Sequence, residues 1–170
     1  DSRTLGGIVV SACIIYDTND DGDFTTCFNL GVDDDSYNTL LYIGHNKWPE
    51  VANTSLAGTA GTPKLEISGV LDPDLPSPID FRVTNMLPGS TLFLILGFSQ
   101  LNAPFKCGTL VPALDLLLPL PTFTGELEFG FNWPGGGIPG GFPVNWQGWI
   151  PDAGAICGFA ATNAVSTTTP

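Results

Sequence analysis

Apolar segments of about five to ten residues alternate with breaks rich in Gly, Pro, Asn and Asp along almost the whole chain. No segment keeps a helical apolar period over several turns, and prolines interrupt most of those in which a helix would otherwise form. Short apolar runs bounded by turn residues are typical of β-strands. We expect strands at residues 7–16, 24–30, 39–44, 64–69, 79–85, 90–98, 107–111, 114–118, 123–131, 145–150 and 155–164.

About ten short strands with regular turn signals predict an all-β fold, a β-sandwich of the jelly-roll type. The 170 residues are enough for one domain with a real core, and no linker or low-complexity tail divides them. We therefore expect a single domain over residues 1–170. The 21 Gly, the 15 Pro and the low charged share of 13% suit a β protein with many turns.

The expected strands are of two kinds. The strand at 123–131 alternates, with its apolar residues on one face and its polar residues on the other. These are Phe123, Leu127, Phe129 and Phe131 on the first face, and Thr124, Glu126 and Glu128 on the second. By contrast, residues 8–16 and 91–98 are apolar on both faces. A strand of this kind needs a cover beyond the second sheet of a sandwich, either a loop of the same chain or a neighbouring subunit.

The acidic segment 17–23 carries four carboxylates in seven residues and has no Lys or Arg near it. Oxygen-bearing side chains recur at Asp17, Asn19 and Asp21, and Gly22 follows at the sixth position. Ca²⁺ takes six to eight oxygens from carboxylates, amides and carbonyls, so it would neutralise this charge. The spacing resembles the first half of an EF-hand or dockerin-type calcium loop, in which Asp23 would supply its backbone carbonyl.

The rest of such a loop is missing, because its twelfth position is Phe28 instead of Glu or Asp. The flanking residues are β-branched and apolar, so we expect a calcium loop on a β-hairpin. The remaining ligands would come from Asp33, Asp34 or Asp35. The alternative is a solvated acidic turn, since Asp, Asn and Gly are the usual turn residues.

The four cysteines allow three pairings. Cys13 and Cys27 lie equally far from Asp20, so we expect them to face each other across the hairpin, at a Cα separation that a disulfide tolerates. The second disulfide, by elimination, is Cys107–Cys157. Disulfides indicate an oxidising compartment, hence a secreted or cell-surface protein, and a start at Asp1 fits a mature form. Buried free thiols are the alternative.

The charge excludes two classes of partner. Five basic residues stand against seventeen acidic ones, whereas binding to the phosphates of a nucleic acid or to an anionic membrane surface requires clustered Lys and Arg, so we expect no nucleic-acid partner. No run of 18 apolar residues exists, so we expect no membrane insertion.

The C-terminal half contains a series of spaced motifs. They include Pro88-Gly89-Ser90-Thr91-Leu92, Gly108-Thr109-Leu110-Val111-Pro112, Trp149-Ile150-Pro151-Asp152 and Gly158-Phe159-Ala160-Ala161-Thr162-Asn163-Ala164. In these motifs, residues 86–170 resemble the C-terminal β-rich module of large secreted proteins of planctomycete-like environmental bacteria. The resemblance implies secretion and a β fold. It implies no activity and no catalytic residues.

Few residues suggest catalysis. The lone His45 lies in a predicted turn, and we find no nucleophile with a nearby base. Glu126 and Glu128 share one strand face, either as paired carboxylates or as a solvated surface. The tryptophans around the Gly-rich segment 133–143 are either core residues or, at Trp133, a glycan contact.

These observations favour a secreted structural protein over an enzyme. We expect it to bind Ca²⁺ and to assemble with copies of itself, as an extracellular filament or surface-polymer subunit, with strand 7–16 as a candidate for donation to the next copy. The alternative is a module that binds a polysaccharide or a cell surface. A glycan-cleaving enzyme that uses Glu126 and Glu128 is a third hypothesis.

Overall fold

The structure is a computed structural model that describes residues 12–15, 27–30, 47–72, 75–134 and 139–169. The chain divides into two compact units, Asp1–His45 and Asn46–Pro170, where the sequence predicts one domain. No helix in the described ranges is long and apolar enough to span a membrane.

The first unit contains one described pair of strands, β1 (Ala12–Ile15) and β2 (Cys27–Leu30), which are antiparallel. Antiparallel pairing on either side of the acidic segment is therefore confirmed. The predicted register is wrong, because Cys13 lies opposite Asn29, and Cys27 lies opposite Ile15. The register of a hairpin is set by its ladder and turn, and not by the spacing of two cysteines about an acidic segment. The disulfide between Cys13 and Cys27 stays a prediction, because their side chains lie outside the described part of the structure.

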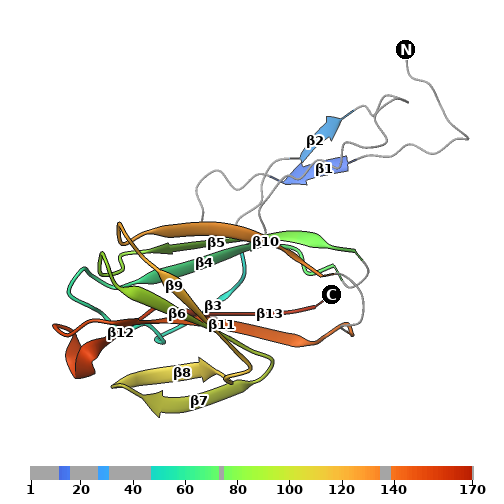
Figure 1. Ribbon diagram of the computed structural model, residues 1–170. Coiled ribbons are helices and arrows are strands. Elements are labelled where there is room, and N and C mark those ends of the chain that lie inside the picture. Colours follow the sequence, from blue (N-terminus) through green and yellow to red (C-terminus); the bar gives the residue numbers. More distant parts are fainter. Residues whose placement is uncertain (1–11, 16–26, 31–46, 73–74, 135–138, 170) are drawn as a thin grey trace, which may run out of the picture. The chain divides into compact units, whose positions relative to one another are not determined.

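The second unit contains two antiparallel sheets that face each other (Figure 1). The three-stranded sheet has the order β10 (Leu127–Trp133), β5 (Ser77–Thr84), β4 (Lys64–Gly69). The larger sheet has the order β3 (Glu50–Val51), β13 (Ala164–Thr168), β11 (Pro143–Pro151), β6 (Thr91–Gly97), β9 (Leu116–Pro121), and β12 (Phe159–Ala161) also pairs with β11. The predicted all-β fold is confirmed.

The core lies between the two sheets, and strand alternation builds it. In β5 every second residue from Ser77 to Val83 is buried, which leaves the residues between them on the outer face. Phe81 meets Trp146 of β11 edge to face, with ring centroids 5.0 Å apart. Leu94 of β6 and Val165 of β13 are fully buried in the same cluster. Burial of each such side chain stabilises the fold by about 1.5–3 kcal/mol.

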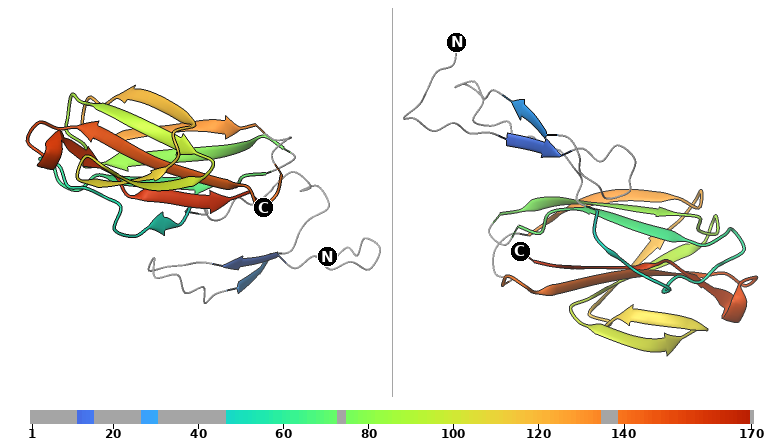
Figure 2. Two further views of the ribbon diagram at one scale, coloured as in Figure 1. Left: turned by 90° about the horizontal axis from the view of Figure 1, so that it is seen from below. Right: turned by 180° about the vertical axis from the view of Figure 1, so that it is seen from behind.

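A third layer covers the outer face of the larger sheet. It is the hairpin of β7 (Gln100–Phe105) and β8 (Gly108–Pro112), which lies on the side of that sheet away from β4, β5 and β10 (Figures 1 and 2). Beneath it a second apolar cluster forms around Ile95 and Trp149. The apolar outer face of strand 91–98 is therefore covered by the same chain, and not by a neighbouring subunit.

Two links hold this hairpin to the sheet. The buried amide of Gln147 on β11 accepts a hydrogen bond from Val111 N at 3.0 Å and donates one to Thr109 O at 3.0 Å. The predicted disulfide Cys107–Cys157 is confirmed, and it joins the hairpin turn to the 3₁₀ turn η1 (Ile156–Gly158).

Several expected strands differ from the observed ones. The strand at 64–69 has the bounds of β4, but the strand expected at 123–131 begins only at Leu127. The preceding turn places Gly125 at φ +87°, a conformation that favours glycine, and leaves Phe123 82% exposed. Phe123 therefore does not share the core face. The expected strand 155–164 is interrupted by η1 and by a break at Thr162 and Asn163.

Candidate functional site

The predicted metal ligands lie outside the described residues. They are Asp17, Asn19, Asp21, Asp23, Asp33, Asp34 and Asp35, and His45 also falls outside. Within the described part of the chain, no group of three or more His, Cys, Asp or Glu side chains is placed to hold a metal ion. Calcium binding thus stays a prediction from the spacing of the acidic segment.

The predicted glycan contact at Trp133 is not supported by its position. Trp133 is 5% exposed and packs in the main core, because it occupies an inward position at the end of β10. Trp48, Trp146 and Trp149 are also buried. A sugar-binding platform needs an exposed ring face, so core packing, the other interpretation of Trp133, is the correct one.

Glu126 and Glu128 are not a pair of carboxylates on one strand. Glu126 precedes β10, whereas Glu128 lies within it and accepts a contact from Arg82 Nε at 3.0 Å. Glu128 and Arg82 are directly opposite each other on β10 and β5. Both side chains are more than half exposed, so this ion pair contributes at most about 1 kcal/mol.

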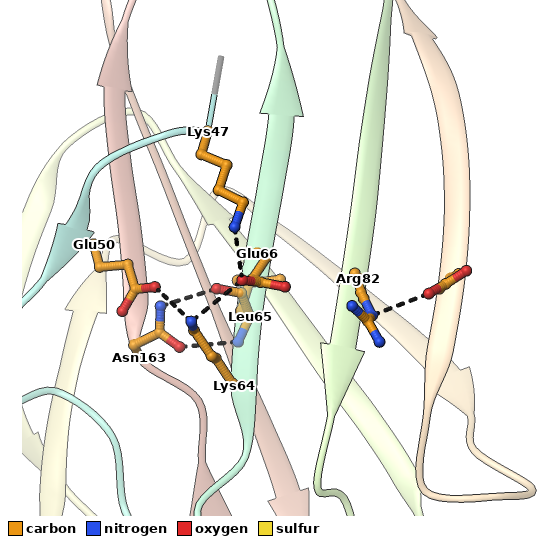
Figure 3. A network of polar contacts seen from close by, with 8 residues as sticks. Lys47, Glu50, Lys64, Leu65, Glu66, Arg82 and Asn163 are labelled. Carbon is orange, nitrogen blue, oxygen red and sulfur yellow. Dashed lines mark hydrogen bonds and ion pairs between the residues drawn. The ribbon is translucent and has the colours of Figure 1, made fainter. Parts of the chain in front are cut away.

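The outer face of the three-stranded sheet carries a chain of ion pairs (Figure 3). Lys64 Nζ lies 3.2 Å from Glu66 and 3.4 Å from Glu50, and Lys47 Nζ lies 3.4 Å from the same Glu66 oxygen. With Arg82, this surface holds three of the five basic residues of a chain whose net charge is −12. It is therefore close to neutral on a strongly acidic protein.

These contacts shift two pKa values. The hydrogen bond to Glu66 raises the pKa of Lys64, and the Glu50 charge adds to it. Burial alone would raise the pKa of Glu66, but the hydrogen bonds and charges of Lys64 and Lys47 outweigh burial and hold that pKa below its usual value. Both groups are charged at neutral pH, so the face combines both signs of charge in a fixed pattern.

One edge of this sheet is closed by the chain itself. The side-chain amide of Asn163 accepts a hydrogen bond from the N–H of Leu65 on β4 and donates one to the carbonyl of the same residue, each at 2.9 Å (Figure 3). Trp48 N donates to Ile67 O at 2.8 Å, and Trp48 Nε1 donates to Gly69 O at 2.9 Å. Leu65 N, Leu65 O, Ile67 O and Gly69 O on the outward side of β4 are thus paired, which largely closes this edge to another strand.

Prolines block the outward edge of β9. Thr122 N bonds Ser90 O, so the even-numbered residues of β9 point to β6 and the odd-numbered ones point away. The outward positions include Pro119 and Pro121, which have no N–H to donate.

The exposed strand β7 is protected in a similar way. It carries Pro104 and a register shift between Gln100 and Ala103. Prolines and bulges are the usual devices that prevent edge-to-edge association of sheets.

The edge of β10 lacks these devices. The backbone N–H and C=O groups of Leu65 and Ile67 on β4 point away from β5, and this fixes which residues of β4 and β5 bond each other. By the same alternation, the β10 residues bonded to β5 are Leu127, Phe129, Phe131 and Trp133. The residues between them, Glu128, Gly130 and Asn132, direct N–H and C=O away from the sheet. All three are exposed, and among the described residues no hydrogen bond to these outward backbone groups is found. β10 is thus the candidate interaction site.

Sequence reasoning did not identify this edge. The signal that would have found it is the distribution of prolines. β7 and β9 contain Pro104, Pro119 and Pro121, whereas the seven residues of β10 contain none.

Comparison with models of protein families, with curated proteins and with solved structures finds no significant match to this chain.

Proposed function

We propose that this protein is a secreted structural protein whose copies assemble with one another. The observation that carries the proposal is the open edge of β10, a seven-residue strand without proline or bulge. Exposed edges of this kind are templates for pairing with another chain, and proteins that remain single normally block them. Among the described residues, partners or prolines protect the edges of β4, β7 and β9, and none is found at β10.

The disulfide Cys107–Cys157 supports the extracellular part of the proposal. Disulfides persist in oxidising compartments and are rare where thiols are kept reduced. This one links segments 50 residues apart in sequence and anchors the third layer of the sandwich. Such a crosslink suits a protein whose role is to hold its shape outside the cell.

Assembly is tested on the native, full-length protein. Sedimentation equilibrium and electron microscopy are expected to show particles larger than one chain, whose fraction rises with protein concentration. Raising the salt concentration serves as a control, because it weakens surface ion pairs but not backbone hydrogen bonds between strands. A single species of one chain at every concentration would overturn the proposal.

The proposal includes a bound Ca²⁺ at the acidic segment 17–23. Its support is the spacing of Asp17, Asn19 and Asp21 ahead of Gly22. A ligand at one hundred times its Kd stabilises the native state by about 2.7 kcal/mol, which corresponds to a rise in Tm of several degrees for a chain of this size. We therefore expect EDTA to lower the Tm and excess Ca²⁺ to restore it.

The matched variant for this test is Asp17→Asn with Asp21→Asn, which removes two charges and keeps the shapes of both side chains. It should show no response of Tm to Ca²⁺. The substitution Asp115→Asn, at a carboxylate that bonds Phe98 N far along the chain, is the control that keeps the response. If the native protein itself shows no shift with Ca²⁺, the segment is only an acidic turn.

A further inference from the structure

We infer that two copies of this chain pair β10 against β10 in antiparallel orientation, with Gly130 of each copy on a two-fold axis. The inference rests on the assembly proposed above and names the partner and the register at that edge.

The outward backbone groups are symmetric about Gly130. They belong to Glu128, Gly130 and Asn132, the middle one lying two residues from each of the others. Placing Gly130 opposite itself brings Glu128 of one copy opposite Asn132 of the second. Each of the three positions then exchanges N–H and C=O with its partner, so about six backbone hydrogen bonds form. A shift of this register by two residues leaves some of these groups without partners.

The side chains on the outer face fit this register. The amide of Asn132 can donate to the carboxylate of Glu128 across the axis, and Gly130 places no side chain between the strands. The two Glu128 residues of a pair are separated by about four residues of strand, roughly 13 Å, so they do not oppose each other. Each Glu128 also keeps its own Arg82, which lies on the other side of β10.

The inner face fits as well. The same register places Phe129 of one copy opposite Phe131 of the second, on both sides of the axis. In the single chain Phe131 is 37% exposed, although it stacks on Phe81 at a centroid distance of 5.6 Å. Aromatic pairs across adjacent strands are among those that stabilise sheets most. Pairing would therefore extend the Phe81–Phe129 stack, whose centroids are 4.9 Å apart, into the second copy.

The charge of the chain also directs association to this sheet. A net charge of −12 makes two copies repel over most of their surfaces. The three-stranded sheet is the exception, because Lys47, Lys64 and Arg82 offset its carboxylates. Copies that meet here avoid most of the repulsion.

A two-fold contact closes on itself, so the unit that enters a larger particle is a dimer. A filament then needs a second contact elsewhere on the chain. The inference therefore predicts particles with an even number of chains.

The first test compares Gly130→Pro with Gly130→Ala in the full-length protein. Both variants add a Cβ, which would lie 2.7 Å from Asp80 Oδ1, the end of a side chain that can rotate. Only proline also removes the outward N–H at the axis. We expect Gly130→Pro to raise the Kd of the dimer by roughly tenfold or more in sedimentation equilibrium, since two hydrogen bonds are lost per dimer, and Gly130→Ala to change it by less than about threefold. Equal effects of the two variants would contradict the inference, and matching urea unfolding curves show that both remain folded.

The second test reads the register. Glu128→Cys and Asn132→Cys proteins are prepared separately and then mixed under mild oxidation. The register brings these two positions opposite each other, whereas residues 128 of the two copies, and likewise residues 132, are about 13 Å apart, beyond disulfide reach. We expect the mixture to form a covalent dimer at least several times faster than either protein alone.

The outcomes separate this inference from the function proposed above. If the native protein assembles but the mixture does not crosslink faster than its components, then another surface carries assembly and the β10 register is wrong. If the native protein does not associate at all, the structural function itself is wrong, and with it the inference. Crosslinking that follows the register, with a loss of dimer in Gly130→Pro alone, supports both.

Discussion

The buried amide of Gln147 offers the sharpest test of how the third layer is attached. Its Oε1 accepts a hydrogen bond from Val111 N, and its Nε2 donates to Thr54 O and Thr109 O, all at 3.0 Å. A longer hydrogen bond, at 3.4 Å, joins Nε2 to Thr162 O. One side chain therefore satisfies backbone groups of the two segments that cover the larger sheet. The substitution Gln147→Leu keeps the size of the side chain and removes all four hydrogen bonds.

The expected loss follows from these contacts. Val111 is fully buried and Thr54 is 7% exposed, so water cannot easily replace the amide at either. A buried backbone group without a partner costs about 1–3 kcal/mol. Because the apolar leucine recovers part of this by burial and the hairpin can shift, we expect Gln147→Leu to lower the free energy of unfolding by about 3 kcal/mol.

The assay is urea unfolding of the native protein and the variant under identical conditions. Gln100→Leu is the matched control, because it makes the same change on the hairpin itself, at an exposed amide whose bonds to Asn145 and Ser166 are longer, at 3.2 Å. It should cost less than about 1 kcal/mol. Hydrogen exchange at the Val111 amide should also accelerate in Gln147→Leu. If the two variants lose the same stability, the buried amide does not anchor the hairpin as argued.

Two further predictions concern acid and reduction. Backbone hydrogen bonding from Thr59 lowers the pKa of Asp152. The contribution of Asp152 to stability is therefore complete above the unfolded pKa of about 3.9 and is lost as pH falls through the lower folded value. Urea midpoints measured from pH 6 to 2 should fall less steeply in Asp152→Asn than in the native protein, and equal slopes would refute the assignment. The double variant Cys107→Ala, Cys157→Ala removes a disulfide between residues 50 apart in sequence, so its free energy of unfolding in urea should fall by about 2–4 kcal/mol. An unchanged midpoint would show that Gln147 alone holds the hairpin.

Strand alternation made the two-layer fold predictable. In β4 and β5, buried and exposed positions alternate as the apolar pattern indicates, so the strand expected at 64–69 agrees with the observed one. The apolar character of both faces of 91–98 also indicated that something covers the outer face. It could not indicate what, because a covering strand such as β7 is itself mostly exposed and reads as a polar loop containing Pro104.

The candidate site was harder to predict, because it depends on which backbone groups remain unpaired. The pairing of β4 uses the side chain of Asn163, which is 98 residues away from Leu65 in the sequence. The exposed edge of β10 is defined only once all neighbouring strands are placed. The acidic segment shows the opposite case, since its spacing alone predicts a Ca²⁺ site from local sequence. The side chains expected to coordinate that ion lie outside the described residues.

The side chain of Asn163 acts at the edge of β4 as a residue of a neighbouring strand would, since it presents one donor and one acceptor to Leu65. This makes the molecule sensitive to chemical ageing. Deamidation would convert Asn163 to aspartate, which has no N–H to offer the Leu65 carbonyl and would set two acceptors against each other in a site that is 7% exposed. Leu65 would then lose a partner and that part of the β4 edge would open, although Trp48 still pairs Ile67 and Gly69.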